Sequence, residues 1–191
     1  MSGLTTVGFF LFSIFFSIVT FVLWARIALR YFHVSALHPL SRNIAAITDA
    51  IIKPITQLFP AKKTRRSRYD VGAIIVLFAV EMIKFTLIGA LFLTTMMPFW
   101  IFLAYVLGDL IVQPCNLLFY AIVIRVIMSW VNPTWHNPMA DVLRAITEPL
   151  LKPMRKHLPT IAGFDISPYL ALVGLKAVML FITASLPLHL I

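Results

Sequence analysis

The sequence predicts an all-α membrane protein with about four transmembrane helices, built from two tandem repeats of the same orientation. Three observations predict this fold. Hydrophobic residues make up 61% of the 191 residues and charged residues only 12%, and the mean hydropathy is +0.95, well above the apolar share of a soluble globular domain. Four apolar segments are long enough to cross a bilayer. The two halves of the chain also align with each other.

The four apolar segments lie at about 4–32, 71–95, 99–131 and 167–188. A transmembrane helix needs roughly 20 apolar residues, so each segment is long enough to span the membrane once. The third segment is longer than one span requires and contains Pro114. It can be accommodated by tilt, by a kink or by extension past the membrane surface.

The loop charges predict the orientation of the chain. All loop lysines and arginines fall on one side of the spans, at Arg42, Lys53, Lys62, Lys63, Arg65, Arg66 and Arg68, and at Arg144, Lys152, Arg155 and Lys156. Cytoplasmic loops carry such an excess, so we expect a multi-pass protein of the bacterial inner membrane with both termini outside the cytoplasm. We therefore expect the net charge of +9 to favour binding to anionic lipid, above all through the basic stretch 62–68. No nucleic-acid partner is expected.

The two halves match at a fixed offset of 99 residues. Repeat 1 occupies 1–98 and repeat 2 occupies 99–191, and each contains a span, an amphipathic element and a second span. The matched pairs are Arg26 with Arg125, Pro39 with Pro138, Thr48 with Thr147, Asp49 with Glu148, Lys53 with Lys152, and Pro54 with Pro153. After four extra residues in the first copy, Asp70 matches Asp165 at an offset of 95. Two spans per unit give both copies the same orientation, with a pseudo-two-fold axis along the membrane normal.

The segment between the spans of each repeat is predicted to be an interfacial amphipathic helix, because its apolar residues recur at helical spacing. They are Leu40, Ile44, Ile47, Ile51, Ile52, Ile55 and Phe59 in the first copy, and Met139, Leu143, Ile146, Leu150, Leu151, Met154 and Leu158 in the second. Interior prolines at Pro54, Pro149 and Pro153 predict two short helices joined at an angle. Such an element lies at the cytoplasmic surface or dips into the membrane.

The second copy carries a specific motif. It reads Thr147-Glu148-Pro149-Leu150-Leu151-Lys152-Pro153 with Arg155 following, and later Asp165-Ile166-Ser167-Pro168. This resembles the YggT family, also called YlmG, whose members carry T-E-P-x-L-x-P-x-R and D-x-S-P. The first copy departs from the motif, since Asp49-Ala50 replaces Glu-Pro and Asp70-Val71-Gly72-Ala73 replaces Asp-x-Ser-Pro.

The resemblance implies a small integral membrane protein without a settled biochemical activity. Bacterial relatives are associated with osmotic-stress tolerance or with division-gene neighbourhoods, and plastid relatives with cytochrome assembly. It therefore favours an accessory or assembly role over catalysis.

Two acidic residues begin the second and fourth spans. Asp70 and Asp165 can cap the free N–H groups there, and Ser167 followed by proline also fits an N-cap. The alternative is an ion pair of these acids with Arg26 and Arg125, which lie near the cytoplasmic ends of the preceding spans. Capping and pairing are compatible.

Four charged residues fall near the bilayer centre, at depths of roughly 14 to 20 Å counted at 1.5 Å per residue: Glu81, Lys84, Asp109 and Lys176. Because an unpaired charge at this depth is costly, two acids and two bases predict mutual neutralisation. Glu81 and Lys176 occupy equivalent repeat positions, so we expect a salt bridge between them, with Lys84 and Asp109 as a second pair. The network either fixes helix register or forms an ion or proton pathway.

No catalytic residue, metal site or cofactor is predicted, because no nucleophile, base and orienting group converge and the histidines lack ligand spacing. The first hypothesis is a non-enzymatic membrane scaffold or assembly factor that contacts lipid and a membrane-protein partner or a second copy of itself. The competing hypothesis is a small ion transporter or channel subunit that uses the midplane charges.

Overall fold

The computed structural model describes residues 3–35, 38–58, 70–92, 98–131, 138–157 and 165–186. These residues form six helices and no strand: α1 (Gly3–Tyr31), α2 (Pro39–Leu58), α3 (Val71–Phe92), α4 (Phe99–Val131), α5 (Pro138–His157) and α6 (Ser167–Ser185). Four of them, α1, α3, α4 and α6, are long and apolar enough to cross a membrane. The prediction of an all-α protein with four spans is confirmed. The predicted basic loop at 62–68 lies outside the described residues.

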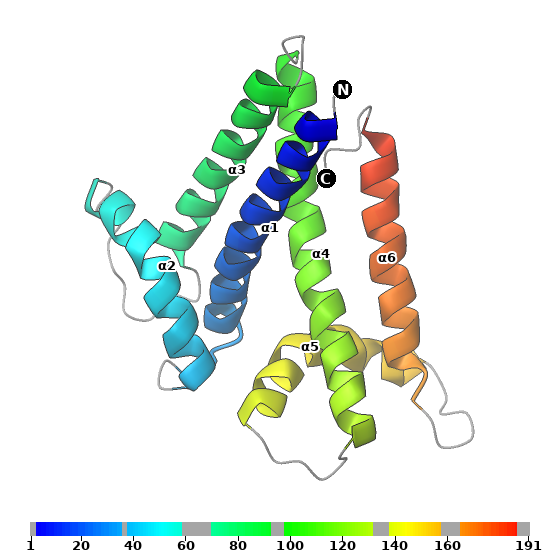
Figure 1. The fold of residues 1–191 in the computed structure, drawn as a ribbon. Coiled ribbons are helices and arrows are strands. Elements are labelled where there is room, and N and C mark those ends of the chain that lie inside the picture. The colour runs from blue at the N-terminus through cyan, green and yellow to red at the C-terminus, as the bar shows by residue number, and fades with distance from the viewer. Residues whose placement is uncertain are drawn as a thin grey trace.

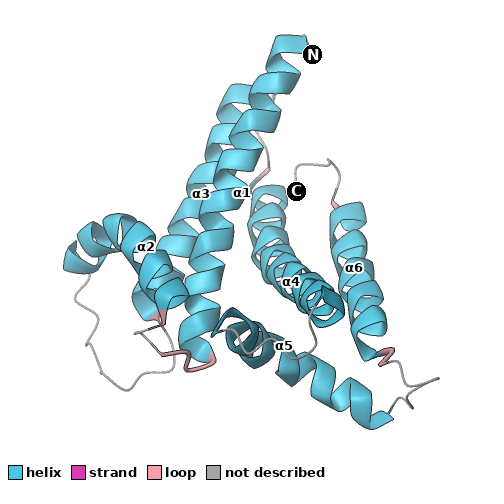
Figure 2. Cartoon of the chain, turned by 60° about the horizontal axis from the view of Figure 1, so that its bottom comes forward, coloured by secondary structure: helices cyan, strands magenta, loops and turns pink. Residues whose placement is uncertain are grey.

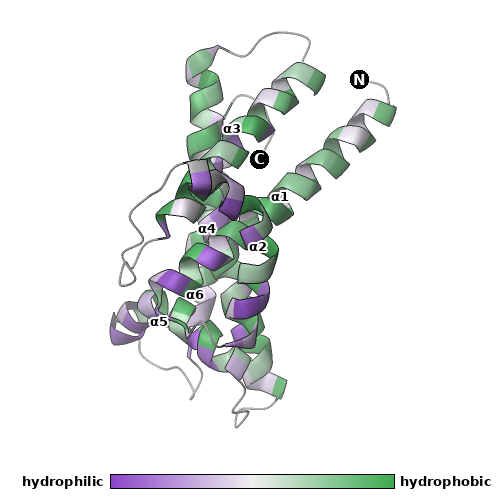
Figure 3. Ribbon diagram, turned by 90° about the vertical axis from the view of Figure 1, so that its left-hand side faces the viewer, coloured by the Kyte–Doolittle hydropathy of each residue, from purple (hydrophilic) through white to green (hydrophobic). Residues whose placement is uncertain are grey.

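The four long helices run side by side, and α2 and α5 lie across one end of the bundle (Figure 1). The first turn of α1 and the last turn of α6 lie at the opposite end. Hydrophilic residues gather on α2 and α5, whereas the long helices are mostly apolar (Figure 3). The chain is therefore polar at one end of the bundle and apolar along its length.

Each half of the chain contains the same small core. One cluster joins α1, α2 and α3 and includes Leu23, Ile52 and Val76. The other joins α4, α5 and α6 and includes Ile122, Leu151 and Ala171. The members correspond one to one at the offsets that relate the two sequence copies, which are 99 for the first two pairs and 95 for the third. Equivalent residues thus pack three helices together in both halves.

The two halves meet along α4. Phe85 and Ile88 of α3 pack against Tyr105 and Val106 of α4, and α4 also contacts α1. A further cluster joins Leu29 of α1 to the second non-spanning helix, α5. By contrast, α6 packs mainly against α4 and α5, so it forms one edge of the bundle.

The non-spanning helices differ from the prediction in one respect. Each is a single helix of 20 residues, although Pro54 lies inside α2 and Pro149 and Pro153 lie inside α5. Figure 2 shows both helices bending rather than breaking into separate pieces. An interior proline removes one backbone hydrogen bond, and the helical turns that flank it are retained because they pack against the spans.

The long third span is also a single helix. It contains 33 residues, with Pro114 inside. At 1.5 Å per residue it measures about 50 Å, which exceeds the roughly 30 Å hydrocarbon core. Its C-terminal turns pack against α5 (Figure 1). The C-terminal turns of α4 therefore reach the end of the bundle where α5 lies, and tilt, a kink and extension past the membrane surface all stay predictions.

Candidate functional site

A first polar cluster lies where α1 meets α2 and α3. Arg26 donates from Nη1 to Thr48 Oγ1 and to Asp49 Oδ1, both at 2.6 Å, and from Nε to Asp70 Oδ2 at 3.1 Å. Arg30 places a second guanidinium 3.0 Å from the same Asp70 oxygen. One arginine near the end of a span therefore holds both the non-spanning helix and the start of the next span.

A second cluster occupies the equivalent place in the other half. Arg125 donates from Nη1 to Thr147 Oγ1 at 2.7 Å and from Nη2 to Glu148 Oε2 at 2.9 Å. Arg155 donates to the other Glu148 oxygen at 2.8 Å and to Asp165 Oδ2 at 2.6 Å. Charge-assisted hydrogen bonds of this length are strong and directional.

The predicted pairing of the span-starting acids is confirmed in one half and wrong in the other. Asp70 pairs with Arg26, as expected. Asp165 pairs with Arg155 on α5, and its expected partner Arg125 is bound instead to α5 through Glu148. The aspartate before the second span of each half is therefore paired with an arginine from a different helix, α1 in the first half and α5 in the second.

The reason lies in two sequence differences between the copies. The residue equivalent to Arg155 in the first copy is Thr56, which carries no charge, and the residue equivalent to Arg30 in the second copy is Ser129. Each copy therefore has one arginine that the other copy lacks. It is Arg30, on the first span, in the first copy and Arg155, on the non-spanning helix, in the second. Arg30 could have been found from sequence, since it follows Arg26 by four residues and so shares its helix face.

The same acids cap the following spans. Asp70 Oδ1 accepts a hydrogen bond from the Ala73 amide at 3.2 Å, which is the N-cap interaction expected of aspartate. Asp165 Oδ1 accepts one from the Ser167 amide at 2.9 Å. Ser167 itself is the first residue of α6, and Ile166 at the cap position makes no side-chain bond. The prediction of a Ser167 cap is therefore wrong, because the helix begins one residue earlier than that prediction requires and Ser167 occupies its first turn instead of the cap position.

Three carboxylates in these clusters are held in the charged form. Burial acts to raise the pKa of Asp49, but the hydrogen bond and the charge of Arg26 outweigh it and lower that pKa. Burial is likewise outweighed at Asp70, whose pKa is lowered by Arg26 and the Ala73 amide. Burial is also outweighed at Asp165, where hydrogen bonds from Arg155 and from the side chain and amide of Ser167 lower the pKa.

The remaining motif residues lie outside the clusters or at their edge. Lys53 lies 3.3 Å from Asp49, but its side chain is 70% exposed. Lys152 and the three prolines Pro54, Pro149 and Pro153 are exposed on α2 and α5. The motif therefore divides into residues that hold the helices together and residues that face outward. Within the described ranges, no three His, Cys, Asp or Glu side chains gather as a metal ion would require.

A third polar cluster lies halfway along the bundle, between α3 and α4. Lys84 forms an ion pair with Asp109, one of the two pairings predicted. Gln113 donates to the other Asp109 oxygen at 3.1 Å, and the Lys84 ammonium lies 3.7 Å from Glu81 Oε2. The three charged side chains are at most 2% exposed. Gln113 could have been predicted, because it lies one helical turn after Asp109.

The other predicted midplane pairing, between Glu81 and Lys176, is wrong. Glu81 is fully buried against α4, with Lys84 as its nearest cation. Lys176 is exposed on α6, which lies on the far side of α4 from α3. Helices α1, α3 and α4 all contact one another, whereas α6 packs mainly against α4 and α5, so the equivalent residues of α3 and α6 do not meet on a central axis.

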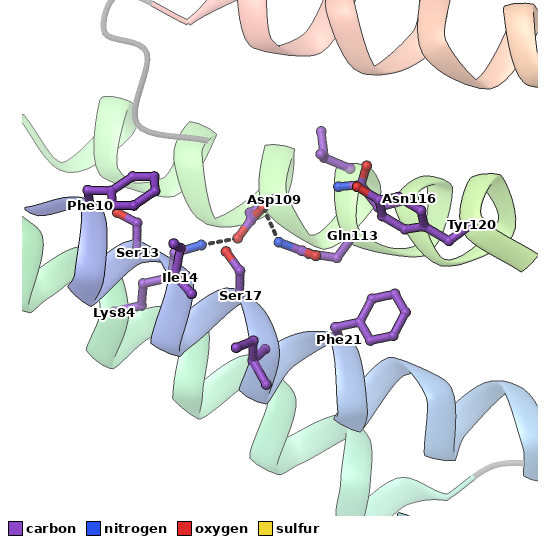
Figure 4. A pocket seen from close by; sticks show the side chains of 12 residues that line it. Phe10, Ser13, Ile14, Ser17, Phe21, Lys84, Asp109, Gln113, Asn116 and Tyr120 are labelled. Carbon is purple, nitrogen blue, oxygen red and sulfur yellow. Dashed lines mark hydrogen bonds and ion pairs between the residues drawn. The ribbon is translucent and has the colours of Figure 1, made fainter. Parts of the chain in front are cut away.

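A cavity of about 670 Å³ opens between α1 and α4 and reaches this cluster (Figure 4). Its polar end contains Lys84, Asp109 and Gln113, and Ser13 and Ser17 of α1 face them. The Ser13 hydroxyl is buried with no hydrogen-bond partner in the described part of the chain. The rest of the wall consists of Phe10, Ile14, Ile18, Phe21, Val112, Asn116 and Tyr120. The cavity can therefore admit a small polar species to a charged site within the bundle.

Comparison with known proteins shows relatives in several bacteria and in a plastid-bearing alga. PA0392 of Pseudomonas aeruginosa is 28% identical over 97% of this chain and 93% of its own length. YggT of Escherichia coli K12 is 28% identical over 88% of this chain and 85% of its own. The ycf19 protein of Galdieria sulphuraria is 33% identical over 42% of this chain but 82% of its own length, so it is about as long as one half of this chain. All three are described as uncharacterised, and no solved structure gives a significant match.

The CCB3/YggT family matches residues 5–91 and 97–186, two stretches that coincide closely with the predicted repeats. The matched stretches contain all three polar clusters and the cavity between α1 and α4. The chain is a member of the CCB3/YggT family.

Proposed function

We propose that the protein is a non-enzymatic scaffold or assembly factor of the bacterial cytoplasmic membrane, in which α2 and α5 form a rigid contact surface for anionic lipid and partner proteins. The observation that carries the proposal is the pair of equivalent arginine clusters. Each fixes a non-spanning helix to the end of a span through two or more hydrogen bonds. A binding surface benefits from such fixation, because ordering it in advance lowers the entropic cost of association.

The outward residues of α2 and α5 suit a membrane surface and its proteins. Five basic side chains are exposed on the two helices: Arg42, Lys53, Arg144, Lys152 and Lys156. Two apolar side chains of α2 accompany them, since Ile47 is 64% exposed and Ile51 is 38% exposed. Basic and apolar groups on one helix favour insertion into an anionic headgroup layer.

The composition of the clusters favours a structural role over chemistry. Every carboxylate in the two arginine clusters is ion-paired within the described residues, and the threonine hydroxyls are bonded to backbone carbonyls of their own helix. No nucleophile with an adjacent base is left to attack a substrate. The resemblance-based link to osmotic-stress tolerance or division fits a protein that organises others at the membrane.

The lipid part of the proposal is tested by native mass spectrometry of the intact protein in mild detergent. The triple variant Arg42→Gln, Arg144→Gln, Lys152→Gln should retain about tenfold less phosphatidylglycerol than the unaltered protein, since each surface cation contributes up to about 1 kcal/mol. The matched control replaces Arg42 and Arg144 by Lys and keeps the charge. Equal retention by both variants would overturn the proposal.

A second candidate function, a small ion transporter or channel subunit, is favoured by the cavity that reaches Lys84 and Asp109. Intramembrane charges beside a cavity often mark an ion or proton path. The measurement is sodium, potassium and proton flux into proteoliposomes that contain the purified protein. Flux that is lost in Asp109→Asn while the protein stays folded would favour this function over the scaffold.

A further inference from the structure

A single lysine is exposed at the middle of the outermost span. Lys176 lies nine residues from Ser167 and nine residues from Ser185, the two ends of α6. At 1.5 Å per residue this is about 13.5 Å from either end, near the centre of the hydrocarbon core. Within the described residues, Lys176 has no hydrogen bond or ion pair, and its side chain is exposed. A lysine this deep is too far from the headgroups to be solvated by extending its side chain toward them.

On α3, the residues equivalent to this part of α6 are covered by a neighbouring helix. Lys176 and Leu180 of α6 are equivalent to Glu81 and Phe85 of α3, each 95 residues apart. Glu81 and Phe85 are fully buried against α4. Leu180, by contrast, is 57% exposed. The first repeat therefore packs another helix on this face, and in the second repeat the same face is open.

Other exposed apolar residues continue this surface. Tyr169 is 69% exposed and Val173 is 47% exposed. Together with Lys176 and Leu180 they follow one another at spacings of four, three and four residues, so they share one side of the helix. We call these four residues the α6 outer face.

We propose that the α6 outer face binds a transmembrane helix of another protein that carries an aspartate or glutamate near the middle of its span. Charge complementarity carries the proposal, because a partner carboxylate neutralises Lys176 at a depth where an unpaired charge is costly. The partner helix would lie on α6 as α4 lies on α3, with its acid opposite Lys176 as Asp109 lies opposite Lys84.

A second copy of this chain does not supply that acid. The chain has seven acidic residues, and the only two inside spans are Glu81 and Asp109, both fully buried. The other five precede the spans or lie on the non-spanning helices: Asp49, Asp70, Asp141, Glu148 and Asp165. The carboxylate must therefore come from a different protein. This face lies within the membrane, so the inference does not depend on the scaffold surface of α2 and α5.

The test uses the full-length protein, labelled with a fluorophore and reconstituted in phosphatidylethanolamine and phosphatidylglycerol vesicles. The probe is a designed leucine and alanine transmembrane helix with one central aspartate, and its matched control has leucine there. Energy transfer reports association. We expect the aspartate helix to bind about five- to tenfold more tightly than the leucine helix, and Lys176→Leu to abolish the difference.

A variant in which the lysine is moved to another face of α6 tests whether binding requires the α6 outer face or only a positive charge on the helix. In the variant Lys176→Leu with Val178→Lys, the lysine moves to another exposed position of α6, since Val178 is 45% exposed but points about 200° away. Loss of binding in this variant supports the α6 outer face as the docking site. Equal binding of the two designed helices, or undiminished binding after relocation, overturns the proposal. Self-association of the labelled protein that requires Lys176 would assign the face to a second copy instead and would also overturn it.

Discussion

Arg26 and Arg125 stand 99 positions apart and make the same contact, each donating from Nη1 to a threonine hydroxyl, Thr48 at 2.6 Å and Thr147 at 2.7 Å. In both cases the threonine hydroxyl lies 2.7 Å from the carbonyl four residues earlier in its helix. The threonine therefore accepts from the arginine and donates to its own helix. This relay joins the non-spanning helix to the span in each half.

Replacing the two arginines should not have equal effects. Arg26→Gln removes bonds to Thr48, Asp49 and Asp70, whereas Arg125→Gln removes bonds only to Thr147 and Glu148. We expect Arg26→Gln to cost about 2–4 kcal/mol of stability and Arg125→Gln roughly half as much, because Arg125→Gln removes fewer charge-assisted hydrogen bonds. In both variants each carboxylate keeps a second cation nearby. Thermal unfolding of the purified variants in detergent measures both. A larger loss for Arg125→Gln would contradict the contact geometry.

Arg155→Gln should loosen the start of α6 while leaving α5 attached. Asp165 loses its ion pair in this variant, but Glu148 is still held by Arg125. Hydrogen exchange should therefore accelerate in the first turn of α6 and change little elsewhere. Lys152→Gln is the matched control, because Lys152 is an exposed cation of the same helix. Equal acceleration in both variants would show that Arg155 acts only through its charge.

Stability should fall in acid as the arginine clusters lose their carboxylates. The pKa values of Asp49, Asp70 and Asp165 are lowered in the folded protein, so their contribution is fully present above the unfolded value of about 3.9. It is lost as the pH falls from there through the lower folded values. The melting temperature should therefore decrease below about pH 4. Arg26→Gln should flatten this decrease, and an unchanged pH profile in that variant would exclude Arg26 as its cause.

A double-mutant cycle distinguishes the pairing in the structure from the one expected by symmetry. Lys84→Met should cost about 3–5 kcal/mol, because it leaves the buried Asp109 without its cation. Asp109→Leu should cost less, because Lys84 still lies 3.7 Å from Glu81, and the double variant should cost less than the sum of the two. Glu81→Gln and Lys176→Met should be additive within about 0.5 kcal/mol. Thermal unfolding in detergent supplies both cycles. Coupling between Glu81 and Lys176 would show that the two residues meet in the membrane.

The orientation expected from the loop charges places α2 and α5 in the cytoplasm. Single cysteines at Arg42 and Lys152 should then react with a membrane-impermeant maleimide only after cells are opened, whereas a cysteine at Phe99 should react in intact cells. The background variant is Cys115→Ser, since Cys115 is the single native cysteine. The reverse labelling pattern would invert the topology and place the basic helices outside.

Much of the candidate site could be predicted from local sequence pattern. Asp70 was expected both to pair with Arg26 and to cap α3, and it does both. These residues lie close to the helix ends at one junction. Because helical spacing fixes which side chains near such an end share a face, only a few partners are possible. The contacts that were missed or wrong, such as Asp165 with Arg155, depend on single differences between the copies that redirect an otherwise symmetric network.

The number of spans, their approximate limits and the correspondence between the two halves follow from the sequence alone, because hydropathy, span length and repeat register are properties of consecutive residues. Which midplane charges meet could not be read from the sequence, because the pairing depends on how each helix is rotated and on which helix packs beside it. In this structure α4 packs against both α1 and α3, and α6 lies at the edge against α4 and α5. Lys84 therefore finds Asp109, and Lys176, at the position equivalent to the buried Glu81, remains on an exposed face.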